Sequence, residues 1–225
     1  MRTMTVHTLV TALPDPELLR ARCRALALLD ALLDPDFPTH TFFPEWRPGV
    51  DLALMDNGIG DQYAVVFDPA GVFLHGFDHE CPATPWREWP RVHWPALLDG
   101  LPPSLAHYPE DPEFQFEEFF DATVCVWREK NAPTWSCGPV TFTADESDGA
   151  DWLFDLLTDG TPDTYVAYAE DYFARPVART AVAAVQSGTP LTRETVTALS
   201  PTADFAAVAV RARELGYAVE EPPAG

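Results

Sequence analysis

Residues 51–80 have the sequence DLALMDNGIGDQYAVVFDPAGVFLHGFDHE, which predicts the centre of the fold. It holds three short runs that are dense in apolar residues, at 51–56, 63–67 and 72–77, each of ordinary strand length. Glycine tolerates positive φ, and Asn, Asp and Pro favour turns. Such residues separate the three runs, in Asn57-Gly58-Ile59-Gly60 and Asp68-Pro69-Ala70-Gly71. Two turns this close together predict a three-stranded antiparallel meander.

A long helix is predicted before the meander. Asp15 can cap its first turn, Pro16 presets the backbone angle, and Glu17 lies at the positive end of the helix dipole. Apolar residues with helical spacing continue to Leu33, where Asp34-Pro35 ends the helix. Residues 1–13 are interpreted as an arm or an edge strand.

After the meander, residues 81–113 are rich in proline and tryptophan. Proline at this density excludes long regular elements, apart from a short helix near 94–98. A second hairpin is predicted from strands at 123–128 and 135–142, joined by a turn at Asn131-Ala132-Pro133.

The chain from Asp148 onward has helical patterns. Helices are predicted at 152–157, 162–172, 178–186 and 202–215, and the tail at 220–225 is expected to fray. The predicted fold class is therefore α+β: an antiparallel sheet of meander plus hairpin, with an N-terminal helix and a helical C-terminal half. We expect one domain over 1–225, with a β-rich part at 1–147 and a helical part at 148–225.

Charge is the clearest global feature of the sequence. Fourteen basic residues against 35 acidic ones give a net charge of −21, and residues 92–174 hold 17 acids against Arg128 and Lys130. Such a field repels phosphate backbones and anionic membranes and speeds encounters with basic partners. We therefore expect a basic protein partner, no nucleic acid and no membrane. The alternative is that the acidity only keeps the protein soluble.

Location follows from what the sequence lacks. There is no run of about 20 apolar residues that could span a bilayer, and no secretory leader pattern at the N-terminus. A cytoplasmic location is expected. The oligomeric state stays open.

The densest polar cluster contains Asp56, Asp61, His75, Asp78, His79 and Glu80. Its residue types suit a divalent metal, with His75, His79 and Glu80 as the candidate ligands. In an extended strand, however, His75 and His79 lie about 13 Å apart, too far to share one ion. The favoured interpretation is a hydrogen-bonded cluster at a strand end, in which Asp61 and Asp78 accept from turn amides. No cofactor and no catalytic residue is predicted, because nucleotide-binding and nucleophile motifs are absent.

A second candidate site is the aromatic and acidic stretch from Phe114 to Asp121. Apolar anchors that alternate with acids could form a contact surface for a basic partner. The alternative is that its phenylalanines belong to the core and its acids merely face water. The predicted partner-binding residues are Glu117, Glu118, Phe119, Asp121, Asp61, Asp78 and Glu80.

Three pieces of residues 51–80 resemble the central β segment of the SUKH superfamily: Gly58-Ile59-Gly60-Asp61, Gly71-Val72 and Asp78-His79-Glu80. The strip Gly76-Phe77-Asp78-His79-Glu80 also resembles a wider bacterial family, a resemblance that implies no activity. Many SUKH proteins are immunity proteins, so the first resemblance implies binding and neutralisation of a cognate toxin.

The functional hypothesis is therefore an acidic protein-binding module, of the immunity type, that neutralises a basic toxin domain. One alternative is a metal-assisted hydrolase that uses Asp61, His75, His79 and Glu80. Another is a regulatory or structural domain.

Overall fold

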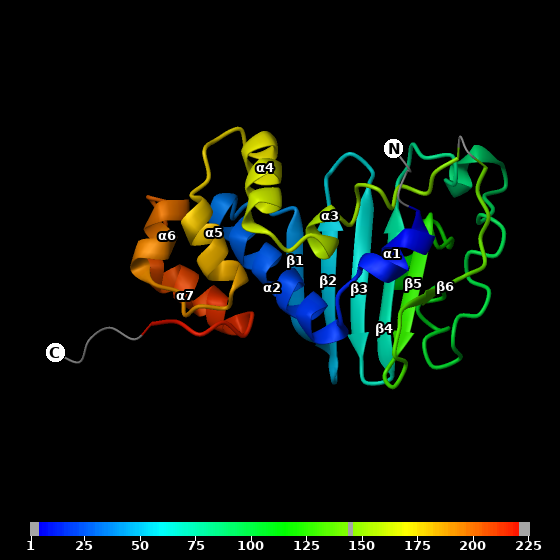
Figure 1. Ribbon diagram of the computed structural model, residues 1–225, viewed down its shortest axis with the longest axis horizontal. Helices are drawn as coiled ribbons and strands as arrows, with labels where there is room; N and C mark the ends of the chain where they lie inside the picture. The colour runs from blue at the N-terminus through cyan, green and yellow to red at the C-terminus, as the bar shows by residue number, and fades with distance from the viewer. Residues whose placement is uncertain (1–4, 144–145, 221–225) are drawn as a thin grey trace.

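The computed structural model describes residues 5–143 and 146–220. Its centre is a six-stranded antiparallel sheet in which each strand pairs with the next along the chain (Figure 1). The strands are β1 His40–Arg47, β2 Val50–Asp56, β3 Gln62–Asp68, β4 Gly71–Phe77, β5 Val124–Glu129 and β6 Ser136–Cys137. The predicted α+β class with an antiparallel meander is confirmed.

The predicted meander and the predicted hairpin form one sheet, because β4 pairs directly with β5. The returning strand of the hairpin is much shorter than expected. Gly138 follows it so closely packed that an added Cβ would lie 1.9 Å from the carbonyl oxygen of Ala96. Pro139 comes next and has no N–H for a ladder, so pairing stops at Cys137.

Strand β1 was not predicted, because Pro44 interrupts its apolar pattern. The β1–β2 register shifts between Phe43 and Arg47, and Glu45 takes a positive φ of 51°. Proline and a bulge are tolerated here because β1 is the first strand of the sheet and lies at its edge.

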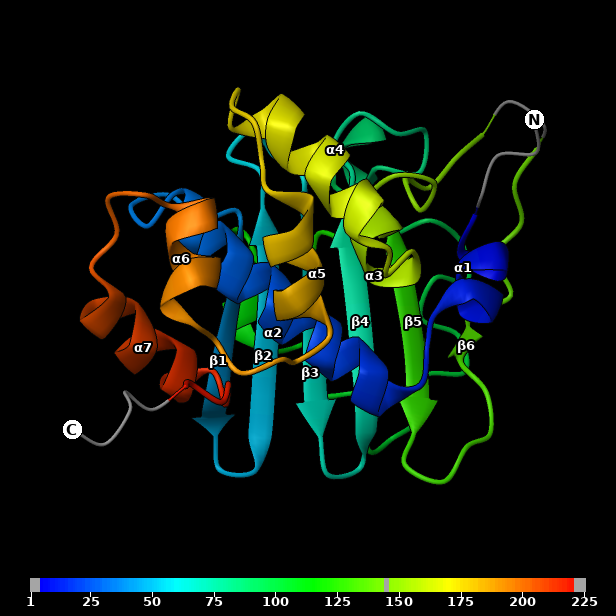
Figure 2. The same ribbon diagram turned by 60° about the vertical axis from the view of Figure 1, so that its left-hand side comes forward.

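Helix α2, Pro16–Leu33, crosses one face of the sheet (Figure 2). The predicted cap is confirmed: the Asp15 carboxylate accepts from the backbone N–H groups of Glu17 and Leu18. Residues 6–12 are not an arm or an edge strand but helix α1, Val6–Ala12. Val6 and Leu9 of α1 are buried, so apolar burial decides the helical state of a segment too short for a helical pattern to stand out.

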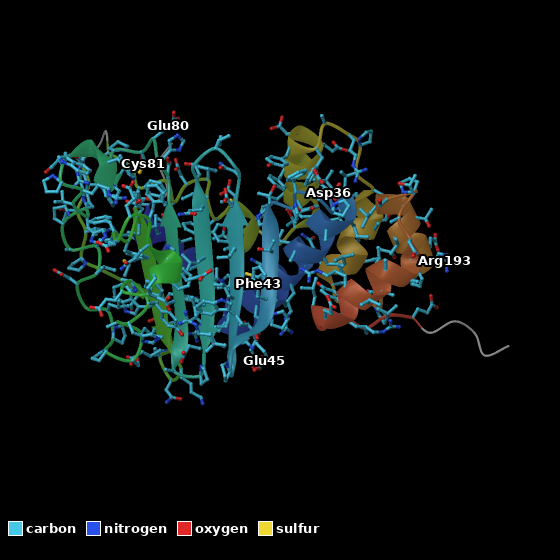
Figure 3. All side chains as sticks on the ribbon, turned by 180° about the vertical axis from the view of Figure 1, so that it is seen from behind. Asp36, Phe43, Glu45, Glu80, Cys81 and Arg193 are labelled. Atoms are coloured by element: carbon cyan, nitrogen blue, oxygen red, sulfur yellow. The ribbon has the colours of Figure 1, made fainter. Side chains whose placement is uncertain are left out.

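The segment between β4 and β5 packs against part of the opposite face of the sheet (Figure 3). Leu105, Tyr108, Phe114 and Phe120 of this segment are buried. The short helix predicted near 94–98 is absent, since these residues form turns. The helical pieces described within the segment are the 3₁₀ turns η1 Pro85–Arg87 and η2 Pro112–Phe114.

The C-terminal part is helical, as predicted. Helix α5 packs against α2, α6 and α7 lie beside the β1 edge, and α3 and α4 lie nearer one end of the sheet (Figures 1 and 2). The sequence missed α6 and placed α3 a few residues early; the predicted tail beyond residue 220 lies outside the described residues. The helices are α3 Asp155–Thr158, α4 Pro162–Tyr172, α5 Arg179–Gln186, α6 Arg193–Leu199 and α7 Phe205–Glu214.

One continuous hydrophobic core extends from Val6 in α1 to Leu215 after α7. It therefore joins the sheet to the C-terminal helices. Within residues 5–143 and 146–220, no helix has both the length and the apolar character needed to cross a membrane.

Candidate functional site

A groove of about 820 Å³ lies between the β2–β3 turn, the segment that enters α3, and α4. Its apolar lining includes Ile59, Trp152 and Tyr172, whose side chains are 73%, 43% and 46% exposed. Exposed apolar side chains that gather in one place, unlike ones scattered singly, mark interaction sites. Their position around one groove makes it the strongest candidate binding site.

The groove has an acidic rim. Asp155, Asp163 and Asp171 line it, and residues 146–174 contain eight acids and no Lys or Arg. Burial raises the pKa of Asp155, and repulsion from Asp151 and Asp159 raises it further. Asp163 is paired with Arg179 of α5. Negative charge is therefore concentrated on this part of the molecule.

The floor of the groove contains a buried network that the sequence did not indicate. Asp30 of α2 is fully buried, and one of its carboxylate oxygens accepts from both the backbone N–H and the Nδ1 of His40, at 2.9 and 2.8 Å. Its other oxygen accepts from the hydroxyl of Tyr165, at 2.6 Å. The network ties α2, β1 and α4 together and fixes the imidazole of His40, which lines the groove.

Asp61 and Asp78 form the hydrogen-bonded strand-end cluster that the sequence favoured. Asp61 accepts from the backbone N–H and the Nδ1 of His79 at 3.0 and 2.7 Å, and from the side-chain amide of Asn57 at 2.8 Å. Asp78 accepts from the backbone N–H groups of Glu80 and Cys81, both at 3.0 Å. The turn amides are satisfied as expected.

This cluster also supports one wall of the groove. The indole Nε1 of Trp152 donates to Asp78 at 3.0 Å, and Asn57, which lines the groove, donates to Asp61. Gly149 lies so close to Asp78 that a Cβ there would approach the Asp78 Cβ to 2.5 Å. Asp61 and Asp78 therefore position groove residues without facing the groove themselves.

The residues that lie close enough together to hold a metal ion differ from the ligands expected from the sequence. Among the described residues, Asp61, Asp78 and His79 form the group whose ligand atoms lie within 4.8 Å of one another. Each carboxylate oxygen of this group already accepts from an N–H donor, so an ion would have to displace those bonds. Glu80 is outside the group, and its side chain is 85% exposed.

His75 is not part of that group either. It lies within β4, facing Phe114 and Phe120 at ring-centroid distances of 5.1 and 4.8 Å. Burial lowers its pKa to about 3, and neither ring nitrogen has a partner among the described residues. The expected ligand set of His75, His79 and Glu80 is therefore not assembled.

The pair of Asp61 and His79 should stabilise the fold most at mildly acidic pH. The hydrogen bond that His79 donates to Asp61 raises the pKa of His79. Burial raises the pKa of Asp61, but the hydrogen bonds that Asp61 accepts outweigh this and lower it. The His79 contribution is complete below the unfolded value of 6.5 and is lost as pH rises through the higher folded value. The Asp61 contribution is complete above 3.8 and is lost as pH falls through the lower folded value.

We therefore expect His79→Gln to destabilise the protein more at about pH 5 than at about pH 8. Urea unfolding at both pH values measures this difference, with the exposed His107→Gln as the control variant. An equal loss at the two pH values would show that the pair contributes no charge-dependent stability.

The stretch from Phe114 to Asp121 is divided between core and surface. Phe114, Phe120 and Asp121 are buried, whereas Glu117 and Glu118 are exposed at a turn with φ values of 47° and 60°. The interpretation of the phenylalanines as core holds for Phe114 and Phe120; Phe116 is 56% exposed and Phe119 is half-buried.

Buried acids cannot present their charge to a partner. Asp61, Asp78 and Asp121 are 5%, 8% and 5% exposed, and Asp121 is paired with Arg91 at 2.7 Å. Their burial argues against direct contact with a partner, and the sequence does not reveal which acids turn inward; a partner-binding role for these three residues stays a prediction. Of the predicted partner-binding residues, Glu80, Glu117 and Glu118 are exposed and Phe119 is half-buried.

The acids of the groove have no helical signal in the sequence. Asp151, Asp155, Asp159 and Asp163 recur every four residues, but α3 ends at Thr158 and α4 begins at Pro162, so this series does not lie along one helix. No sequence pattern indicates the floor residues Asp30 and His40. Asp30 lies in a helix rich in apolar residues, and His40 lies in strand β1, which the sequence does not predict.

Comparison of the chain with family models, with curated proteins and with solved structures gives no match.

Proposed function

We propose that this protein binds a basic segment of another protein in the groove between the β2–β3 turn, α3 and α4. The observation that carries the proposal is the combination of exposed apolar side chains with Asp155, Asp163 and Asp171 around one groove, of which, among the described residues, Asp163 alone is paired with an arginine, Arg179. Aromatic anchors give affinity when they are desolvated, and surrounding charge gives specificity and a fast association.

The size of the groove sets the kind of contact. A volume of about 820 Å³ suits a few side chains of a chain segment rather than a whole domain face. The acidic rim would repel phosphate groups, so nucleic acid is not proposed as a ligand.

The finer form of the proposal is an immunity-type inhibitor in the bacterial cytoplasm that neutralises a basic toxin domain. The net charge of −21 and the resemblance of residues 51–80 to the SUKH superfamily support it. The alternative of a metal-assisted hydrolase has the grouping of Asp61, Asp78 and His79 in its favour, but the hydrogen bonds within that group oppose it.

The groove can be tested with a defined probe, a fluorescein-labelled peptide of alternating Leu and Lys. The triple variant Asp155→Asn, Asp163→Asn and Asp171→Asn should bind it about tenfold more weakly, since each exposed charge contributes roughly 0.5 kcal/mol. Fluorescence anisotropy measures the Kd, which should also rise with ionic strength.

The matched control removes three exposed acids elsewhere, by Glu17→Gln, Glu110→Gln and Glu194→Gln. Equal weakening in both triple variants would show that net charge alone attracts the peptide. Loss in a Glu117→Gln, Glu118→Gln variant, without loss in the groove variant, would move the site to the surface predicted from the sequence.

The inhibitor role has its own test. If a neighbouring gene encodes a basic toxin domain, co-expression of this protein should restore growth, and the groove triple variant should protect less than the control variant does. Full protection by the groove variant would contradict the role of the groove in neutralisation.

A further inference from the structure

The floor of the groove offers hydrogen-bond acceptors that the protein does not use. The Asp30 oxygen that accepts from the backbone N–H of His40 also lies 2.8 Å from Nδ1 of its ring, and we assign the ring proton to Nδ1. With this assignment Nε2 can accept a hydrogen bond, and it makes none with any residue in the described ranges.

Two hydroxyl groups lie in the same wall. The oxygen atoms of Thr39 and Tyr168 are buried and lack a hydrogen-bond partner among residues 5–143 and 146–220, although Thr39 itself is 4% exposed and lines the groove. Burial raises the pKa of Tyr168, so the phenol stays protonated; the Thr39 side chain lowers that pKa through a weak hydrogen bond that falls outside ordinary hydrogen-bond geometry. A buried hydroxyl without a partner costs about 1–3 kcal/mol, which a ligand donor would recover.

Aromatic rings surround these acceptors. The rings of His40 and Tyr168 are 5.5 Å apart and nearly perpendicular, and Tyr168 stacks on Tyr172 at 5.7 Å. The faces of tyrosine rings attract cations, most strongly where water is excluded.

We infer that the floor of the groove binds a primary ammonium group, such as the end of a lysine side chain, through Thr39, His40 and Tyr168. This inference rests on the proposed function and names the side chain that the groove selects. An ammonium group has three donors on one atom, which match three separate single-atom acceptors. A guanidinium group instead prefers the two oxygens of a carboxylate, and those of Asp30 are already occupied.

The test uses small probes that need no partner protein. In NMR titrations with n-butylammonium, n-propylguanidinium and n-butanol, the ammonium should bind most tightly, with shifts centred on His40 and Tyr168. Thr39→Val and Tyr168→Phe should each weaken its binding about fivefold. The matched controls Thr197→Val and Tyr217→Phe, which lie outside the groove, should leave it unchanged.

The outcomes separate this inference from the proposed function. Butanol binding as tightly as butylammonium, or variants that bind it unchanged, would overturn the ammonium site. If the Leu/Lys peptide binds in the groove and replacing each lysine by arginine changes nothing, the proposed function stands and the ammonium site falls. If butylammonium binds and the peptide does not, the ammonium site stands and the proposed function falls.

Discussion

Asp30→Ala is expected to lower the free energy of unfolding by about 3–5 kcal/mol, the range for breaking a buried, fully hydrogen-bonded ionisable pair. Asp30 is fully buried, and its removal leaves three donors without an acceptor: two from His40 and one from Tyr165. The same change frees the imidazole that lines the groove, so the variant should also lose binding of the basic peptide.

Urea unfolding followed by circular dichroism measures the loss. Asp36→Ala provides the control, since Asp36 is an exposed acid close to the end of the same helix and should cost less than about 0.5 kcal/mol. A loss below about 1 kcal/mol for Asp30→Ala would mean that the network does not hold α2, β1 and α4 together.

Arg91→Ala should have an effect of similar size, about 3–5 kcal/mol, because it leaves the Asp121 carboxylate buried without its counter-charge. The guanidinium of Arg91 also lies over the rings of Trp86 and Phe119, at 4.6 and 4.9 Å. Its loss therefore removes packing as well as charge from the segment that covers the sheet.

The pH dependence of this variant has a defined sign. Burial raises the pKa of Asp121 and Arg91 lowers it, so without Arg91 the folded pKa rises further above the unfolded value. An ionised Asp121 then destabilises the fold, and the deficit should shrink as pH falls and the carboxyl is protonated.

Two further variants complete the test of Arg91. The exposed Arg213→Ala serves as the control and should change stability by less than about 0.5 kcal/mol. The double variant Arg91→Met, Asp121→Leu should recover much of the loss, since apolar replacements of a buried pair are often neutral. A deficit in Arg91→Ala that grows as pH falls would contradict the pairing.

Local signals made the centre of the fold predictable. The turns at Asn57–Gly60 and Asp68–Gly71 and the cap at Asp15 are each decided by a few neighbouring residues, and the structure contains all three. Strand β1 and helix α1 were not predictable, because their conformation depends on contacts with distant residues. Phe42 of β1 is buried against Phe67, and the backbone N–H of Val6 in α1 donates to the Asp148 carboxylate.

The candidate site was harder to predict than the fold. The sequence shows which residues are acidic but not which face solvent, so Asp61, Asp78 and Asp121 were indistinguishable from Glu117 and Asp155. The hydrogen bonds that hide the first three involve residues up to 74 positions away, as between Trp152 and Asp78. A local sequence pattern cannot predict a hydrogen bond between residues so far apart in the chain.

The groove is assembled from parts of the chain that meet only after folding: Thr39 and Ile59 come from one part of the sequence, and Trp152 and Tyr172 from another. An unfolded chain therefore has no such site, and any occupant binds the native state alone. By mass action, an occupant at a hundred times its Kd would add about 2.7 kcal/mol to the stability of the whole protein. The melting temperature should then report the concentration of the partner, and the bound protein should resist proteases that the free protein does not.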